Sequence, residues 1–90
     1  MKSATIKIYG QDWSVRVLKR HKGLKKNIGW TNSVKNEIIV SANYTEDLQK
    51  STLLHELIHI VSQANDIDLS EKEVLALEAG LYSVIDFELR

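Results

Sequence analysis

The hydrophobic pattern of this chain changes its period near residue 45, and that change limits the possible folds more than any other feature. Residues 4–18, 28–31 and 37–41 have the alternating or β-branched pattern of short strands. From Thr45 onward the apolar residues recur every three or four positions, as in helices that pack on a core. The order of these segments predicts an α+β fold, in which a small antiparallel sheet of two hairpins precedes two packed helices.

Turn signals divide the first half of the chain into the two hairpins. Residues 10–12 (Gly-Gln-Asp) interrupt the first alternating segment, and residues 32–36 separate the two later strands. No repeat, low-complexity tract or linker divides the chain, so residues 1–90 are expected to form one domain.

Capping signals mark the two helices of the second half. Thr45 is expected to cap a first helix that ends near Ala64 and has acidic residues in its first turn. Ser70 and Glu73 have the spacing of a capping box, which predicts a second helix from this point to about Glu88.

The absence of cysteine from the sequence restricts the chemistry that is available. Disulfides and thiolate metal sites are excluded, so a bound metal must use histidine or carboxylate ligands. No segment has the length and apolarity of a membrane span or of a signal sequence. We therefore expect a cytoplasmic protein that does not associate with membranes.

Charge is divided unevenly along the chain, although the formal net charge is zero. Residues 1–26 carry eight Lys or Arg and one acid, whereas residues 37–90 carry eleven acids and three Lys or Arg. Attraction between the two halves of one small domain accounts for this division, and binding of a charged partner is the alternative. In that second case the run from Lys19 to Lys26 could contact the phosphates of a nucleic acid.

The motif His55-Glu56-Leu57-Ile58-His59 lies in the middle of the first predicted helix. Residues four positions apart share one helix face, so both imidazoles can reach a single ion. Two histidines and a third protein ligand leave one of the four positions of zinc open for water, and Glu56 then stands beside that position as a general base. The competing interpretation is that His55 and His59 are partly buried histidines bonded to backbone or carboxylate groups.

The third ligand is expected to be acidic, and spacing alone leaves its identity open. Glu71 and Glu78 lie on the same edge of the apolar face of the second helix, about 10 Å apart along its axis, so only one of them can reach the metal. Asp66 is a minor alternative, whereas Glu73 is explained by the capping box.

The residues around this motif resemble the site helix of small phage- and prophage-encoded zincins, which are similar to the ImmA/IrrE class of metallopeptidases. The resemblance covers about residues 28–85 and rests on residues 51–59 (STLLHELIH), 37–40 (EIIV) and 69–71 (LSE), with Val74, Leu77 and residues 80–82 (GLY). It implies a minimal zincin-like fold, a Zn²⁺ site of His55, His59 and Glu71, and peptidase activity on an intracellular protein, in some relatives a repressor. Glu71 is selected because the class has a Glu-x-x-Val step at the start of this helix.

A peptidase also needs an edge that binds its substrate and a donor that stabilises the oxyanion. The strand of residues 37–41 is expected to be the edge that pairs with an extended substrate. A donor that stabilises the oxyanion is also expected, and Tyr82 and Tyr44 are candidates. The alternative function is a catalytically quiet zinc-binding module of phage or prophage origin, which binds a protein or a nucleic acid. The sequence gives no prediction of the oligomeric state.

Overall fold

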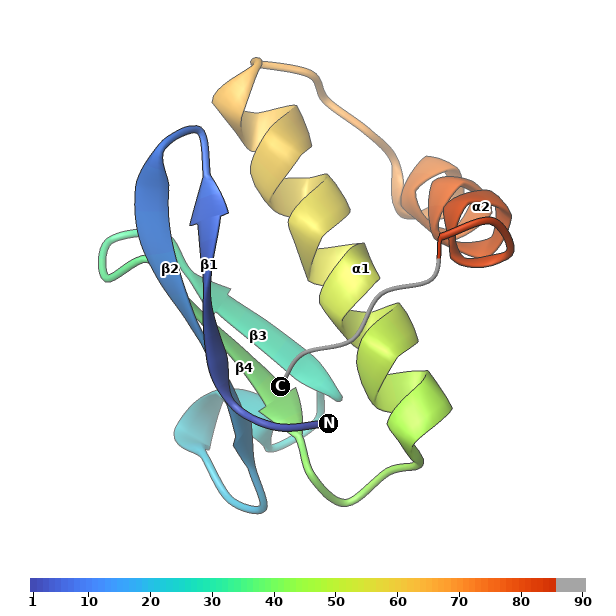
Figure 1. Ribbon diagram of the computed structural model, residues 1–90. Coiled ribbons are helices and arrows are strands. Elements are labelled where there is room, and N and C mark those ends of the chain that lie inside the picture. The colour runs from blue at the N-terminus through green and yellow to red at the C-terminus, as the bar shows by residue number, and fades with distance from the viewer. Residues whose placement is uncertain (86–90) are drawn as a thin grey trace.

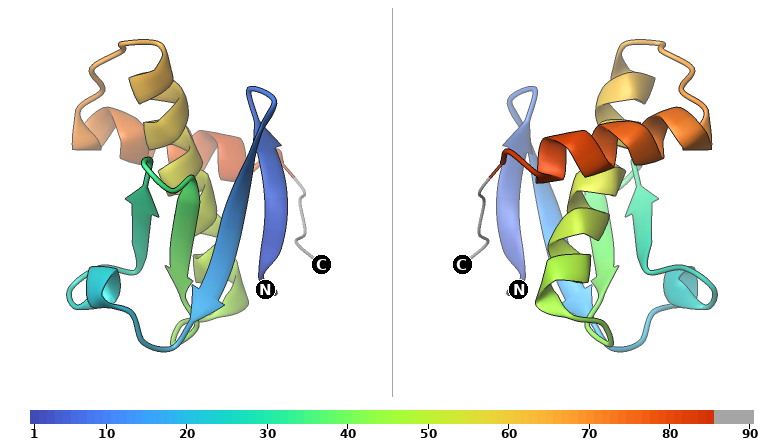
Figure 2. Two further views of the ribbon diagram at one scale, coloured as in Figure 1. Left: turned by 90° about the vertical axis from the view of Figure 1, so that its left-hand side faces the viewer. Right: turned by 90° about the vertical axis from the view of Figure 1, so that its right-hand side faces the viewer.

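The computed structural model describes residues 1–85 of the chain and confirms the α+β class (Figure 1). Helix α1 lies between a four-stranded sheet and helix α2, and Figure 2 shows α2 lying across α1 on the side away from the sheet. The elements in chain order are β1 (Ala4–Ile8), β2 (Gln11–Leu18), the short 3-10 helix η1 (Lys22–Leu24), β3 (Gly29–Asn32), β4 (Glu37–Ser41), α1 (Glu46–Ala64) and α2 (Glu71–Tyr82).

The two predicted hairpins are confirmed, but the sheet that they form is mixed rather than antiparallel. Its strand order is β1-β2-β4-β3, with antiparallel pairing inside each hairpin and parallel pairing between β2 and β4. The connector of residues 19–28 crosses the end of the sheet, so β3 does not pair with β2 and the position beside β2 stays free for β4. Because β4 is antiparallel to β3, it runs in the same direction as β2.

The first turn lies one residue earlier than the sequence predicts. Tyr9 and Gly10 connect β1 to β2 and have positive φ angles of 51° and 76°, as in the two-residue turns that match the twist of a hairpin. The second turn falls within the predicted residues 32–36. The side chain of Asn32 accepts hydrogen bonds there from the backbone nitrogens of Val34 and Lys35, at 3.1 and 3.3 Å.

Both helix starts are confirmed, whereas the predicted end of the second helix is wrong. The Thr45 hydroxyl accepts a hydrogen bond from the backbone at the start of α1, and the capping box of Ser70 and Glu73 is complete. The hydrogen bond from the Ser70 backbone, followed by the contribution of its hydroxyl, lowers the pKa of Glu73. Helix α2 ends at Tyr82, where the Ser83 hydroxyl donates to the carbonyl of Gly80 at 2.6 Å. The remainder of the predicted extension, residues 86–88, lies outside the described residues.

Helix α1 packs against the sheet on one side and against α2 on another, and one stripe of its surface lies outside these two apolar contacts. One apolar cluster fills the space between the sheet and α1 and includes Val15, Ile38, Val40 and Leu53. A second cluster of Leu54, Ile58 and Val74 joins α1 to α2. Within residues 1–85, no helix has both the length and the apolarity needed to cross a bilayer.

Candidate metal centre

The remaining stripe of α1 carries His55, Glu56 and His59, between the edge of the sheet and α2. The two histidines are half-buried, and their ring centroids lie 4.9 Å apart with an angle of 65° between the ring planes. The helical spacing therefore brings both imidazoles to one place, as the motif predicts.

Glu71 completes a group of three potential ligands. One of its carboxylate oxygens lies 3.0 Å from Nε2 of His55, and the other lies 3.6 Å from Nε2 of His59. One ligand atom from each of the three residues falls within 4.8 Å of the others. Tetrahedral zinc with bonds of about 2.0–2.2 Å places neighbouring ligand atoms about 3.4 Å apart, so this donor set fits the ion in kind and in spacing.

Local structure at the start of α2 places Glu71 at this site. Ser70 caps the helix and makes Glu71 its first residue, which directs the carboxylate toward α1. The Glu71 side chain is 63% exposed, so the candidate metal position is open to solvent on that side. An accessible ion is required if a substrate is to approach it.

Glu78 lies on the other side of the His55 ring. Its Oε1 atom is 2.8 Å from Nδ1 of His55, and its second oxygen accepts a hydrogen bond from the Ser51 hydroxyl at 3.2 Å. A carboxylate on Nδ1 fixes the ring orientation and leaves Nε2 as the nitrogen that can bind a metal. Glu78 therefore contacts a candidate ligand rather than the candidate metal position.

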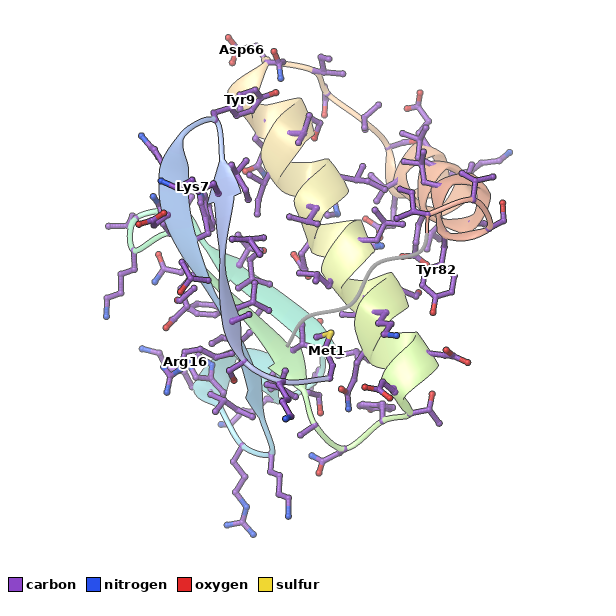
Figure 3. The ribbon with its side chains drawn as sticks, viewed as in Figure 1. Met1, Lys7, Tyr9, Arg16, Asp66 and Tyr82 are labelled. Carbon is purple, nitrogen blue, oxygen red and sulfur yellow. The ribbon has the colours of Figure 1, made fainter. Side chains whose placement is uncertain are left out.

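Asp66, the minor alternative, does not belong to the group that converges. It has a positive φ of 52° in the loop after α1 and its side chain is exposed. Figure 3 shows it just beyond the last turn of α1, on the outside of the molecule. The sequence left three acids as possible third ligands, and the geometry favours Glu71.

Glu56 is held by a residue that sequence reasoning did not single out. The hydroxyl of Thr31, on β3, donates a hydrogen bond to Oε2 of Glu56 at 2.6 Å. Gly29, two residues earlier on the same face of the strand, allows β3 to come this close, because a Cβ there would lie 2.6 Å from the Thr52 side chain and 3.0 Å from Glu56. Because side chains alternate between the two faces of a strand, Gly29 and Thr31 both face α1. The sequence of β3 alone does not indicate which helix they contact.

The expected substrate-binding edge is wrong, and another strand takes its place. Strand β4, of residues 37–41, lies between β2 and β3 and has partners on both sides, whereas β3 is an edge strand. The backbone nitrogen of Ser41 donates to the carbonyl of Ile28 at 2.8 Å. Since alternate residues of an antiparallel strand bond to the same neighbour, Gly29 and Thr31 direct their backbone groups outward, away from β4.

A cavity of about 450 Å³ lies against this edge. Gly29 of β3, Glu56 and His55 of α1, and Leu75 and Glu78 of α2 contribute to its walls. His59 and Glu71 are not among its lining residues, so the candidate metal position lies at the rim of the cavity. The right-hand view in Figure 2 shows the same arrangement of elements, with α2 crossing in front of α1 and β3 uncovered at the sheet edge.

Neither candidate tyrosine lies at this cavity. The Tyr82 hydroxyl donates to the backbone carbonyl of Asp47 at 3.2 Å, and Figure 3 shows its ring beside the N-terminal half of α1. Burial, with the negative charge of Asp47, raises the pKa of Tyr82. Tyr44 lines a second cavity at the end of the sheet. The expected oxyanion donor is therefore not found in either of these two residues.

Comparisons of the chain with protein-family models, with curated proteins and with solved structures found no match.

Proposed function

We propose that this chain is a zinc-dependent peptidase, with His55, His59 and Glu71 as the metal ligands. The observation that supports this most is the position of Glu56, which lies beside the ligand group and is held by Thr31 at the open edge of β3. A purely structural site has no need of a carboxylate beside the open edge of a sheet. The resemblance of residues 51–59 to the site helix of phage-type zincins supports the same function.

The chain's own residues then divide the work of peptide hydrolysis. Backbone groups of Gly29 and Thr31 pair with an extended substrate and place its peptide bond over α1. Zinc, when bound, supplies a Lewis acid that polarises the carbonyl group of that bond. Glu56 accepts a proton from the attacking water and returns it to the leaving amine. Glu78 keeps His55 in the tautomer that presents Nε2.

The substrate in this proposal is an intracellular protein or peptide, and the protein acts in the cytoplasm. A chain without cysteine needs no oxidising compartment for its folding. The cavity beside Glu56 is lined by residues 26–29, at the start of the open β3 edge, and such an edge can pair with the backbone of an extended peptide.

The test combines metal content with proteolysis. Wild-type protein loaded with zinc is incubated with a proteome-derived peptide library, and new termini are identified by mass spectrometry. Glu56→Gln should retain about one zinc per chain but cleave at least about 100-fold more slowly, since general base catalysis contributes about 10²–10⁴-fold. Glu46→Gln, on the exposed first turn of the same helix, is the matched control and should cleave like wild type.

Equal cleavage by Glu56→Gln and wild type would contradict the proposal. A folded wild type that takes up no added zinc would also contradict it, and would indicate that His55 is held only by its two carboxylate contacts.

A catalytically quiet zinc-binding module is the second candidate. It is favoured by the positions of Tyr82 and Tyr44, which leave the peptidase without the oxyanion donor expected from the sequence. Stoichiometric zinc binding without any cleavage of the library would select this function over the first.

A further inference from the structure

The connector between β2 and β3 is a strongly basic segment at one end of the sheet. Its cations within residues 19–26 are Lys19, Arg20, Lys22, Lys25 and Lys26. In the described part of the chain, none of the five has a carboxylate within ion-pair distance. The ion pairs that Lys or Arg do form there are Lys7–Asp12 and Arg16–Glu37, both outside the connector.

This finding changes the interpretation of the uneven charge distribution. Attraction between the two halves of the domain explains the sequence pattern, but within residues 1–85 no direct ion pair joins the connector cations to the acidic half. Five positive charges within eight residues therefore act together on the solvent and on any ligand nearby.

A second cavity, of about 310 Å³, lies against this connector. Its lining includes Lys19, Arg20 and Lys25, together with the polar side chain of Asn43. Asn27 lines this cavity and also the cavity that contains Glu56, so the two hollows meet at that residue. A ligand that extends from one to the other passes from the candidate catalytic residues onto a cationic surface.

The edge of β3 leads from the cavity beside Glu56 toward the cationic cavity. Asn27 and Ile28 directly precede Gly29, the first residue of the strand, so a peptide paired with Gly29 and Thr31 leaves the strand toward the connector. An extended chain advances about 3.3 Å per residue, and successive side chains point to opposite sides. Within a few residues of the cleaved bond, such a peptide lies beside the cations of the connector.

We propose that residues 19–26 of the connector form a subsite for an acidic segment of the peptide substrate, on the side of the cleaved bond that passes Gly29. This inference rests on the proposed peptidase function, and it names the class of substrate: an extended peptide with several Asp or Glu residues on one side of the cleaved bond.

Acidic peptide fits these observations better than nucleic acid does. The cationic cavity continues into one whose walls carry Glu56 and Glu78, and these carboxylates repel a phosphate backbone that follows the same path. Tyr44 is exposed and lines the cationic cavity, whereas Trp30 packs against Gly23 and His21. Single strands usually stack on successive exposed aromatic rings, and residues 19–26 contain no Phe, Tyr or Trp.

Binding is measured separately from cleavage by using the Glu56→Gln background. The probe is a fluorescein-labelled twelve-residue peptide, in which a Thr-Val-Thr-Val segment stands between two runs of four glutamates. A second peptide has glutamine in place of each glutamate. By fluorescence anisotropy in about 50 mM salt, the glutamate peptide should bind about tenfold more tightly, and raising the salt to about 200 mM should reduce the difference.

Two double variants locate the interaction. Arg20→Gln/Lys25→Gln removes two cations that line the second cavity and should reduce the preference for the glutamate peptide to about threefold or less. Lys7→Gln/Lys35→Gln removes the same charge at the opposite end of the sheet, near the two hairpin turns, and should leave the preference unchanged.

Equal binding of the two peptides would overturn the inference, and so would an equal loss in the two double variants. A twenty-base-pair DNA duplex that binds more tightly than the glutamate peptide, with the same loss in Arg20→Gln/Lys25→Gln, would overturn it in favour of a nucleic-acid surface. The peptide-library experiment separates this inference from the function on which it rests. Cleavage without enrichment of Asp or Glu on one side rejects the subsite alone, whereas selective binding without cleavage rejects the peptidase.

Discussion

The Oε1 atom of Glu78 lies 2.8 Å from Nδ1 of His55, on the side of the ring opposite the nitrogen that faces Glu71. Two acids on one helix, seven residues apart, thus contact the two nitrogens of one imidazole. The sequence presents them as alternatives for a single role, whereas the structure gives them different positions. This difference leads to a prediction about how each one affects metal binding.

Glu71→Gln should weaken zinc binding more than Glu78→Gln does. The first substitution removes the charge of a proposed metal ligand, and the second removes only the partner that orients His55, a change that typically costs about 10–100-fold in metal affinity. Zinc affinity is measured by competition with a chromogenic chelator on each purified variant. A larger loss in Glu78→Gln than in Glu71→Gln would reverse the assignment of the two acids.

Thr31→Val should slow cleavage while leaving the metal in place. Valine has the shape of threonine but cannot donate the 2.6 Å hydrogen bond to Glu56, so the carboxylate loses its fixed position. Small displacements of catalytic groups are costly, and we expect kcat to fall about tenfold with little change in KM or zinc content. Thr5→Val, at an exposed position of β1, is the control and should leave kcat unchanged. An unaltered kcat in Thr31→Val would mean that this hydrogen bond does not position the base.

Gly29→Ala should destabilise the protein, and Gly80→Ala should not. The new methyl group at residue 29 would lie 2.6 Å from the Thr52 side chain, which forces β3 away from α1. We expect a loss of about 1–3 kcal/mol in the free energy of unfolding, measured with urea. A Cβ at Gly80 meets no atom within 4 Å, and alanine in a helix should add up to about 1 kcal/mol. Similar stability changes for both variants would show that β3 is not packed tightly against Glu56.

Much of the fold follows from local sequence signals, because each of these signals reports a local physical preference. The capping box at Ser70 and the cap at Thr45 satisfy backbone groups of their own helix, and both helices begin where these residues predict. The parallel pairing of β2 and β4 could not be predicted in this way. It depends on where the connector crosses the sheet, and no residue within β2 or β4 records that path.

The site shows the same division between local and long-range information. The spacing of His55 and His59 is a property of one helix, so their convergence could be predicted from the motif. The contact between Thr31 and Glu56 joins residues 25 positions apart, and it depends on β3, rather than β4, being the sheet edge. With β4 expected at the edge, the sequence assigns no role to Thr31.

Tyr82→Phe should lower stability slightly and leave cleavage unchanged. The Tyr82 hydroxyl bonds to Asp47 rather than facing the cavity, so its loss should cost no more than about 1 kcal/mol in the free energy of unfolding at pH 7. The pKa of Tyr82 is raised in the folded chain above its ordinary value of 10.0, so this contribution is complete below pH 10 and is lost as the pH rises through the folded value. Urea unfolding of wild type and Tyr82→Phe at pH 7 and about pH 11 should show a smaller stability difference at the higher pH, with Tyr44→Phe as the stability control. A fall in kcat for Tyr82→Phe would return this residue to the reaction as the donor that stabilises the oxyanion.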